Sequence, residues 1–361
     1  MFLPIALLMM NLNDFSEIVR FHQNRYPQMK PRDYIKLAYQ SEFGPEHLVT
    51  DKERVLSYLR KEWEEINETD EPCRSEPIGN GLFRFYLGKV DNIESSSSLL
   101  ADLFMFTAKE HEGSKEGLLS RLDQLKNFSI PGMDDFLSEY ESSNYPAVHH
   151  SQEYRDLYHP HYRLLSSVYA YYFSFLNEIQ SKLQSVDKKP LIISIDGLCG
   201  SGKTYLSQLI QRLFSCNVFH VDDYYLPISK RKENWEQIPG GNIDFDRFIN
   251  EVIKPAANNE PVSYQPYVCR TGTLKEAEQI QPLKLVIVEG SYSGHPLLQD
   301  YYDYKIFMNC SKYVQEKRLR KREGDYFSAF EKRWIPLEHN YFRTYNIQQK
   351  SDLVLDTTEF D

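Results

Sequence analysis

The stretch Gly197-Leu-Cys-Gly-Ser-Gly-Lys-Thr204 decides how the second half of the chain folds. It matches the pattern G-x-x-x-x-G-K-[ST] at every fixed position. An apolar run at 191–195 precedes it, and apolar residues at 206, 209, 210, 213 and 214 follow it with helical spacing. The sequence therefore predicts a strand, a glycine-rich turn and a helix in direct succession.

Glycine-rich turns of this kind bind phosphate groups. The glycines let the backbone turn tightly so that successive N–H groups point inward, and the following helix adds partial positive charge at its N-terminus. The lysine carries a full charge to the outer phosphates, and the threonine hydroxyl is a ligand for Mg²⁺. A turn without a ligand is the alternative, which the flanking strand and helix disfavour. We predict ATP and Mg²⁺ as cofactors, with nucleotide contacts from Gly197, Gly200, Ser201, Gly202, Lys203 and Thr204.

Short apolar runs alternate with helix-sized segments throughout the rest of this half. The candidate strands are 191–195, 218–221, 285–288, 306–308 and 353–355. Several are apolar without alternation, as is typical of strands that are buried on both faces of a parallel sheet. Strands separated by helices indicate βαβ units. We therefore predict an α/β domain over 191–361, an open parallel sheet flanked by helices.

Two acidic residues follow predicted strands at the same edge of this sheet. Asp222 follows the second strand and Glu289 the third. Open parallel sheets bind ligands outside the carboxyl ends of their strands. We predict that Asp222 accepts the proton of an acceptor hydroxyl or helps to hold the metal, whereas Asp223 fits a helix cap or a solvated turn better. Thr204, Asp222 and Glu289 together suit one Mg²⁺.

A basic segment lies near the end of the chain. Residues 312–333 contain eight basic and four acidic side chains, a net charge of +4. A basic helix on this fold can close over the transferring phosphoryl group as a lid, and Arg318 and Arg322 would share one helix face. An ordinary solvated helix face is the alternative for any single one of these residues. The predicted catalytic residues are Lys203, Asp222, Arg318 and Arg322, and Lys321 is a further predicted nucleotide contact.

The first half of the chain has a different pattern. We predict a mainly α-helical domain over 1–183 and a linker over 184–190, which is polar and ends in proline. A turn at Gly79-Asn80-Gly81 indicates a short hairpin near 79–87. Apolar residues at 164, 165, 168, 169, 172, 176, 179 and 183 predict one long helix.

Composition limits the classes of protein that fit. The 361 residues are 41% hydrophobic and 26% charged, a soluble globular profile. Residues 1–180 hold 28 acidic and 18 basic residues, so the whole net charge of −10 lies there and disfavours nucleic acid and anionic membranes. Five cysteines without C-x-x-C spacing favour a reducing cytoplasm over a disulfide framework. The apolar run at 2–10 is too short to span a bilayer, so a strand or packing tail is expected.

Histidines gather at the end of the first domain. The cluster contains His149, His150, Glu153, His159 and His161. A metal site is one interpretation, but zinc ligands normally show tighter paired spacing on a defined element. A tyrosine- and histidine-rich surface between the domains, with hydrogen-bonded ring edges, is the interpretation we favour.

Residues 190–358 resemble the uridine kinase and phosphoribulokinase branch of P-loop kinases. The glycine-rich turn, Asp222-Asp-Tyr-Tyr225, Glu289-Gly290 and Arg318-Leu-Arg-Lys-Arg322 occur in the order of that family with suitable spacing. The resemblance covers a little under half of the chain and implies the P-loop kinase fold for 191–361. It also implies that Asp222 is the general base toward a nucleoside 5′-hydroxyl, and that Glu289 joins the Thr204 hydroxyl around Mg²⁺.

The resemblance extends to the acceptor. Asn242-Ile-Asp244 is similar to the family's Asn-Phe-Asp stretch, whose aspartate holds the ribose hydroxyls, and Tyr264 is similar to the tyrosine that stacks on the base. The family's base-reading histidine is missing from Tyr264-Gln-Pro-Tyr-Val-Cys-Arg270, so a different acceptor is expected. The predicted substrate-binding residues are Tyr225, Asp244, Tyr264 and Arg270.

These features predict an ATP-dependent kinase that phosphorylates a hydroxyl of a nucleoside-like or other polar small molecule. The alternative is a nucleotide-dependent switch whose helical domain binds a partner, which the missing histidine and the large first domain motivate. A nucleic-acid NTPase is a third and weaker option, because the chain has no long basic stripe. We expect a cytoplasmic protein without nucleic-acid or membrane partners, and the sequence leaves a homo-oligomer open.

Overall fold

The computed structural model describes residues 14–45, 51–66, 74–90, 92–186 and 189–360. The chain forms two compact units, Met1–Glu178 and Ile179–Asp361, and the division falls inside helix α9 (Ser167–Ser185). The apolar run at 2–10 and residues 187–188 of the expected linker lie outside the described residues. Within those residues, none of the helices has the length and apolar character needed to cross a bilayer.

The N-terminal unit combines helices with a small antiparallel sheet, in which β1 (Ser75–Gly79) pairs with β2 (Leu82–Tyr86) and β2 with β3 (Tyr162–Ser166). The turn between β1 and β2 is Asn80-Gly81, directly after Gly79 at the end of β1, so the predicted hairpin is confirmed. All five residues of β2 are buried, since helices pack around this sheet. The helices are α2 (Phe15–Arg25), α3 (Pro31–Phe43), α4 (Lys52–Glu65), α5 (Ile93–Glu110), α6 (Lys115–Leu125), α7 (Met133–Ser142), α8 (Gln152–Tyr158) and α9.

The long helix predicted from residue 164 begins later than expected. Leu164 and Leu165 belong to strand β3, and the helix begins at Ser167. The difference arises because β2 needs a second partner strand. β1 pairs with one edge of β2, and β3 pairs with the other edge, with Phe83 opposite Leu165. Two adjacent buried leucines satisfy a helical stripe and a strand buried on both faces equally well, so periodicity alone could not separate them.

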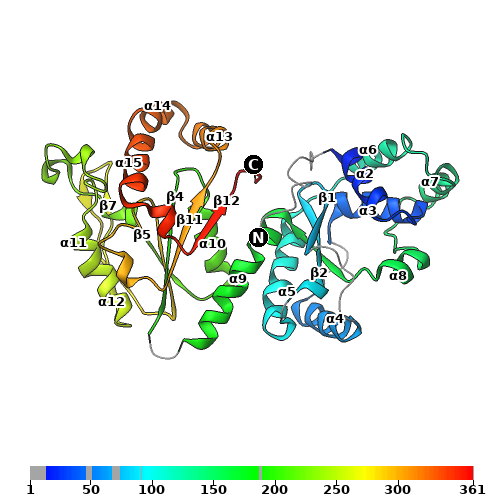
Figure 1. The fold of residues 1–361 in the computed structure, drawn as a ribbon, viewed down its shortest axis with the longest axis horizontal. Coiled ribbons are helices and arrows are strands. Elements are labelled where there is room, and N and C mark those ends of the chain that lie inside the picture. The colour runs from blue at the N-terminus through cyan, green and yellow to red at the C-terminus, as the bar shows by residue number, and fades with distance from the viewer. Residues whose placement is uncertain (1–13, 46–50, 67–73, 91, 187–188, 361) are drawn as a thin grey trace. The chain divides into compact units, whose positions relative to one another are not determined.

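The C-terminal unit is built on a five-stranded parallel sheet in the order β12-β11-β4-β10-β5 (Figure 1). The prediction of an open parallel sheet flanked by helices is confirmed, and each of the five predicted strands is present. Their bounds are β4 (Leu191–Gly197), β5 (Asn217–His220), β10 (Leu285–Glu289), β11 (Tyr304–Asn309) and β12 (Leu353–Asp356).

The register of the sheet positions the site. Glu289 at the end of β10 pairs with Ile195 on one side and with His220 on the other. The strand that leads into the glycine-rich turn, the strand that ends before Asp222 and the strand that ends at Glu289 therefore finish at one edge. Every residue of β4 and β10 is buried, and each large apolar side chain buried there contributes about 1.5–3 kcal/mol to folding.

Helices and short strands complete this unit. Two of its helical turns are π-helical, Ile249–Ile253 and Phe330–Trp334, a rare geometry that often occurs at functional sites. Besides short 3-10 turns, the α-helices and further strands described in this unit are α10 (Lys203–Leu213), α11 (Phe245–Phe248), α12 (Lys254–Ala257), β6 (Val262–Tyr264), β7 (Tyr267–Val268), β8 (Thr273–Leu274), β9 (Glu278–Ile280), α13 (Lys312–Glu323), α14 (Phe327–Ala329), α15 (Ile335–Tyr345) and α16 (Ile347–Lys350).

Candidate active site

The glycine-rich turn has the backbone of a phosphate cradle. The φ values are 137° at Gly197, 78° at Gly200 and 93° at Gly202, and residues other than glycine rarely adopt such values. At Gly197 a Cβ atom would lie 2.1 Å from the carbonyl oxygen of Met308. Helix α10 begins directly after the turn, at Lys203. Its N-terminus therefore faces the space that the turn encloses, as an anion site requires.

Lys203 is buried against the turn. Its Nζ atom donates to the carbonyl oxygens of Gly197 at 2.8 Å and Leu198 at 3.1 Å, and lies 3.5 Å from the hydroxyl of Ser291. Ser201 is fully buried, and its carbonyl oxygen accepts the Thr357 hydroxyl. The contacts of Lys203 keep its ammonium group beside the backbone N–H groups of the cradle, where it would meet a polyphosphate.

Thr204, Glu289 and His220 form a chain of contacts next to the cradle. The Thr204 hydroxyl donates to Oε1 of Glu289 at 3.1 Å, and Nδ1 of His220 lies 2.6 Å from Oε2. Burial alone would raise the pKa of Glu289, but the His220 hydrogen bond and the Lys203 charge outweigh it and lower that pKa. The same hydrogen bond raises the pKa of His220. The structure thus brings the predicted metal ligands Thr204 and Glu289 together, whereas His220 had no signal in the sequence.

Asp222 lies just beyond strand β5. Its Oδ1 atom accepts the Tyr225 hydroxyl at 3.1 Å. Asp222 is an exposed residue, but desolvation by the protein around its carboxyl group raises the pKa of that group to about 6; Lys203 opposes this shift and Glu289 reinforces it. A carboxylate with a pKa near the working pH suits a general base.

Two buried acids beside the turn escaped the sequence reasoning. Asp196, 1% exposed, accepts the N–H groups of Gly197 and Gly294 and the Tyr341 hydroxyl. Burial raises its pKa to about 6. Glu338 of α15, 5% exposed, accepts the N–H of Cys199 at 3.0 Å. Asp196 directly precedes the motif, a position that could have flagged it, while nothing in the sequence connects residue 338 with residue 199.

The basic helix α13 supports the cradle from outside. Arg318 donates to the carbonyl oxygens of Gly200, Thr357 and Phe360 and to the Thr357 hydroxyl. Arg322 pairs with Glu323, and Lys321 is exposed. The catalytic and nucleotide-binding roles of these three residues stay predictions, and Arg318 has in addition a clear role in holding the turn.

The predicted acceptor residues lie in different surroundings. The Tyr264 ring packs in the core near Phe219 and Tyr224, and its hydroxyl donates to Asp223. Asp244 caps α11 by accepting the N–H of Arg247.

Of the other two, Tyr225 adjoins the Asp222 carboxylate, whereas Arg270 is exposed in the turn between β7 and β8. Only Tyr225 of the four therefore touches the predicted base, and the acceptor-binding roles stay predictions.

Aromatic and basic side chains adjoin Tyr225. The rings of Tyr225 and Trp334 have centroids 6.5 Å apart, as have those of Trp334 and Trp235. The guanidinium groups of Arg231 and Arg333 lie 4.7 and 4.9 Å from the Trp235 ring centroid. This acceptor-side cluster of Tyr225, Arg231, Trp235, Arg333 and Trp334 joins the loop after Asp222 to the π-helical turn before α15.

The predicted histidine cluster does not gather around one point. His150 is buried between Asp33, 3.1 Å from Nδ1, and the Tyr162 hydroxyl, 2.8 Å from Nε2, whereas His149 and His159 are exposed. Among the described residues, no group of three or more histidine, cysteine, aspartate or glutamate side chains is arranged to hold a metal ion. His150 therefore has a structural role inside the N-terminal unit.

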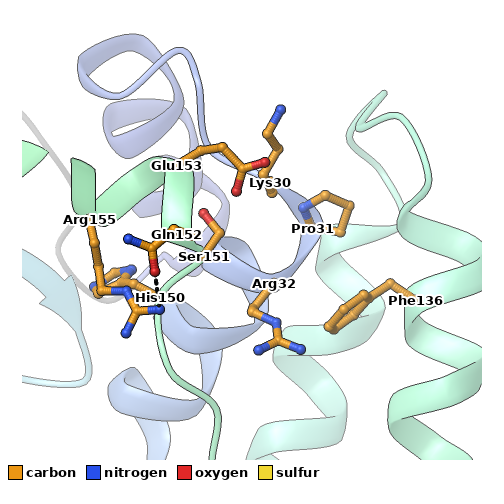
Figure 2. A pocket seen from close by; sticks show the side chains of 9 residues that line it. All are labelled: Lys30, Pro31, Arg32, Phe136, His150, Ser151, Gln152, Glu153 and Arg155. Atoms are coloured by element: carbon orange, nitrogen blue, oxygen red, sulfur yellow. Dashed lines mark hydrogen bonds between the residues drawn. The ribbon is translucent and has the colours of Figure 1, made fainter. Parts of the chain in front are cut away.

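A pocket of about 420 Å³ lies beside His150, wholly within the N-terminal unit (Figure 2). A hydrogen bond of 2.8 Å joins Arg155 to Gln152 at its rim. The pocket contains none of the residues predicted to bind nucleotide or acceptor. Its lining residues are Lys30, Pro31, Arg32, Phe136, His150, Ser151, Gln152, Glu153 and Arg155.

Comparison with known proteins finds relatives named uridine kinase. The chain is 30% identical over 152 residues to that of Leuconostoc citreum (strain KM20), covering 38% of this chain and 70% of the relative. It is 31% identical over 147 residues to that of Chlamydia pneumoniae, covering 37% and 64%. A solved structure described as a possible uridine kinase from Bacillus stearothermophilus gives a TM-score of 0.40 and 17% identity over 51% of this chain and 98% of that one. No family model matches the chain.

The matched residues lie in the C-terminal half, the half that carries the cradle and the two strand-end carboxylates. The resemblance inferred from the motifs is confirmed by this similarity. The chain belongs to the uridine kinase family.

Proposed function

We propose that the protein is an ATP-dependent kinase that transfers the γ-phosphoryl group to a hydroxyl of a small polar, nucleoside-like molecule. The observation that carries this proposal is the meeting of Lys203, Thr204, Glu289 and Asp222 at one edge of the sheet. Family membership supports phosphoryl transfer. The absent base-reading histidine and the buried Tyr264 ring support an acceptor other than uridine.

The residues present fit a magnesium ion. The Thr204 hydroxyl and the Glu289 carboxylate are oxygen donors that already touch, and Asp222 adds a second carboxylate beside them. Mg²⁺ prefers such oxygen ligands and takes the rest from substrate phosphates and water. When bound, it would neutralise the negative charge that develops on the phosphate oxygens.

The protein's own groups would catalyse the reaction by aligning the acceptor hydroxyl with the γ-phosphate. The cradle and Lys203 hold the phosphates, and Asp222 accepts the proton of the acceptor hydroxyl. The acceptor oxygen then bonds to the γ-phosphorus as the bond from that phosphorus to the bridging oxygen breaks, and ADP leaves. Tyr225, hydrogen-bonded to Asp222, positions the carboxylate.

An acceptor screen tests the proposal. ADP release would be measured with ATP, Mg²⁺ and a panel of nucleosides, sugars and other polyols, in the wild-type protein and in Lys203→Ala. Stimulation by one acceptor class, lost in Lys203→Ala with the fold intact, is expected. The control is Lys284→Ala, which removes an exposed lysine before β10. A flat screen together with nucleotide-dependent binding of a protein partner would instead favour a switch.

A further inference from the structure

Glu338 places a buried negative charge inside the phosphate-binding turn. Its Oε2 atom accepts the N–H of Cys199 at 3.0 Å, and its Oε1 atom accepts the Ser291 hydroxyl. Cys199 is the third residue of the turn that begins at Gly197. A backbone donor of the cradle is therefore already bound to an anion that belongs to the protein.

The position of this carboxylate is the outer-phosphate end of the cradle. Ser291, which donates to Glu338, lies 3.5 Å from Nζ of Lys203, the group that would hold the outer phosphates. A triphosphate bound there would place further negative charge within a few ångströms of Glu338. Like charges at such a distance repel strongly where the protein limits solvent access.

The helix that carries Glu338 also reaches the acceptor side. Trp334 stands four residues earlier on a continuous helical backbone, so both side chains lie on one face. The Trp334 ring adjoins Tyr225, which donates to Asp222. Tyr341 and Phe342, further along the same helix, are anchored in the hydrophobic core. The segment before them contains the π-helical turn Phe330–Trp334, a geometry that is rare and frequently occurs at functional sites.

We propose that the charge of Glu338 opposes ATP binding. Packing of Trp334 on Tyr225 holds the Glu338 side chain against the phosphate-binding turn. An acceptor that contacts Trp334 would release the helical segment that carries Trp334 and Glu338. The Glu338 carboxylate would then leave the Cys199 N–H, and the cradle would be free to bind the phosphates. This inference rests on the proposed kinase function. It gives the enzyme a means to avoid hydrolysing ATP when no acceptor is bound.

Calorimetry with ATP and with AMP, both with Mg²⁺, tests the charge effect. Glu338→Gln keeps a side chain of the same shape that can still hydrogen-bond, but removes the charge. We expect about tenfold tighter binding of ATP, little change for AMP, which lacks the outer phosphates, and faster acceptor-independent ATP hydrolysis. Glu331→Gln, which removes an exposed acid of the same segment, should match the wild type.

The outcomes separate the inference from the proposed function. If the wild-type protein binds no ATP, the proposed function fails. If it binds ATP but a folded Glu338→Gln variant, checked by thermal unfolding, binds it no more tightly, the inference is wrong and Glu338 merely holds the turn.

A double-mutant cycle tests the link to Trp334. Trp334→Ala should itself tighten ATP binding, and Glu338→Gln should then add less than it adds in the wild type. Full additivity would refute the role of Trp334.

Discussion

His220 holds Glu289 by the carboxylate oxygen that points away from Thr204. Nδ1 of His220 lies 2.6 Å from Oε2, while Oε1 accepts the Thr204 hydroxyl at 3.1 Å. The imidazole thus orients the oxygen that would face a metal ion. Outer partners of this kind typically change metal affinity 10–100-fold when removed. We expect His220→Ala to raise the Mg²⁺ concentration for half-maximal activity by about tenfold.

A magnesium titration at fixed ATP concentration would measure this effect. His220→Gln, which can still donate to Glu289, should recover part of the affinity. Unchanged magnesium dependence in His220→Ala, with the fold intact, would show that Thr204 alone orients Glu289.

As the proposed general base, Asp222 should set the acid limb of the pH profile. Desolvation raises its pKa to about 6, and a general base must be deprotonated to accept a proton. We therefore expect kcat/KM to fall about tenfold per pH unit below about pH 6. Asp222→Asn should lose nearly all activity, whereas Asp246→Asn, which alters an exposed acid, should keep the same profile. A profile that stays flat down to pH 5 would assign the base elsewhere.

Asp196 makes folding depend on pH in the direction opposite to that of most carboxylates. Its pKa is about 6 in the folded chain against 3.8 for an ordinary aspartate, so the folded state binds the proton more tightly. Protonation of Asp196 therefore stabilises the folded chain. Its contribution to the free energy of unfolding, at most about 3 kcal/mol, is fully present below about pH 4 and is lost as the pH rises through about 6. Urea unfolding between pH 4 and 7 should show this loss in the wild type and not in Asp196→Asn. Equal pH slopes in the two proteins would contradict the assignment.

Gly197 cannot be replaced, because its backbone and its surroundings both exclude a side chain. An added Cβ would lie 2.1 Å from the Met308 carbonyl oxygen at a φ of 137°. We expect Gly197→Ala to cost more than about 3 kcal/mol of stability. Gly324→Ala is the matched control, since φ is also positive there but open space surrounds the site, and it should cost only the backbone strain, about 1–2 kcal/mol. Thermal unfolding of both variants would decide.

The sequence predicted the parallel sheet well, for a physical reason. Strands buried on both faces are continuous apolar runs, and 191–195 and 285–288 are such runs inside β4 and β10. The motif then placed Lys203 and Thr204 at the start of a helix, and the positions of Asp222 and Glu289 after strands placed both acids at one edge. These features depend on local order along the chain, which a sequence displays directly.

Contacts between distant segments could not be predicted in this way. Glu338 meets Cys199 across 139 positions, and Tyr341 meets Asp196 across 145. Glu338 has no local spacing that distinguishes it from a solvated or capping residue, and the position of Asp196 directly before the motif does not reveal its partner Tyr341. The stripe that begins at residue 164 predicts helix for Leu164 and Leu165, which instead lie in β3, because the partner strand β2 lies about eighty residues away and only that pairing explains the strand.

Arg318 has a consequence for how the protein should be handled. Its guanidinium group joins the carbonyl oxygen of Gly200 to those of Thr357 and Phe360, so the final residues buttress the nucleotide loop. Trimming residues 357–360, or fusing a tag that pulls them away, would remove three acceptors of that guanidinium: the hydroxyl and carbonyl oxygens of Thr357 and the carbonyl oxygen of Phe360. A protein shortened at this end would then bind the nucleotide more weakly, although none of the residues expected to touch the nucleotide had been changed.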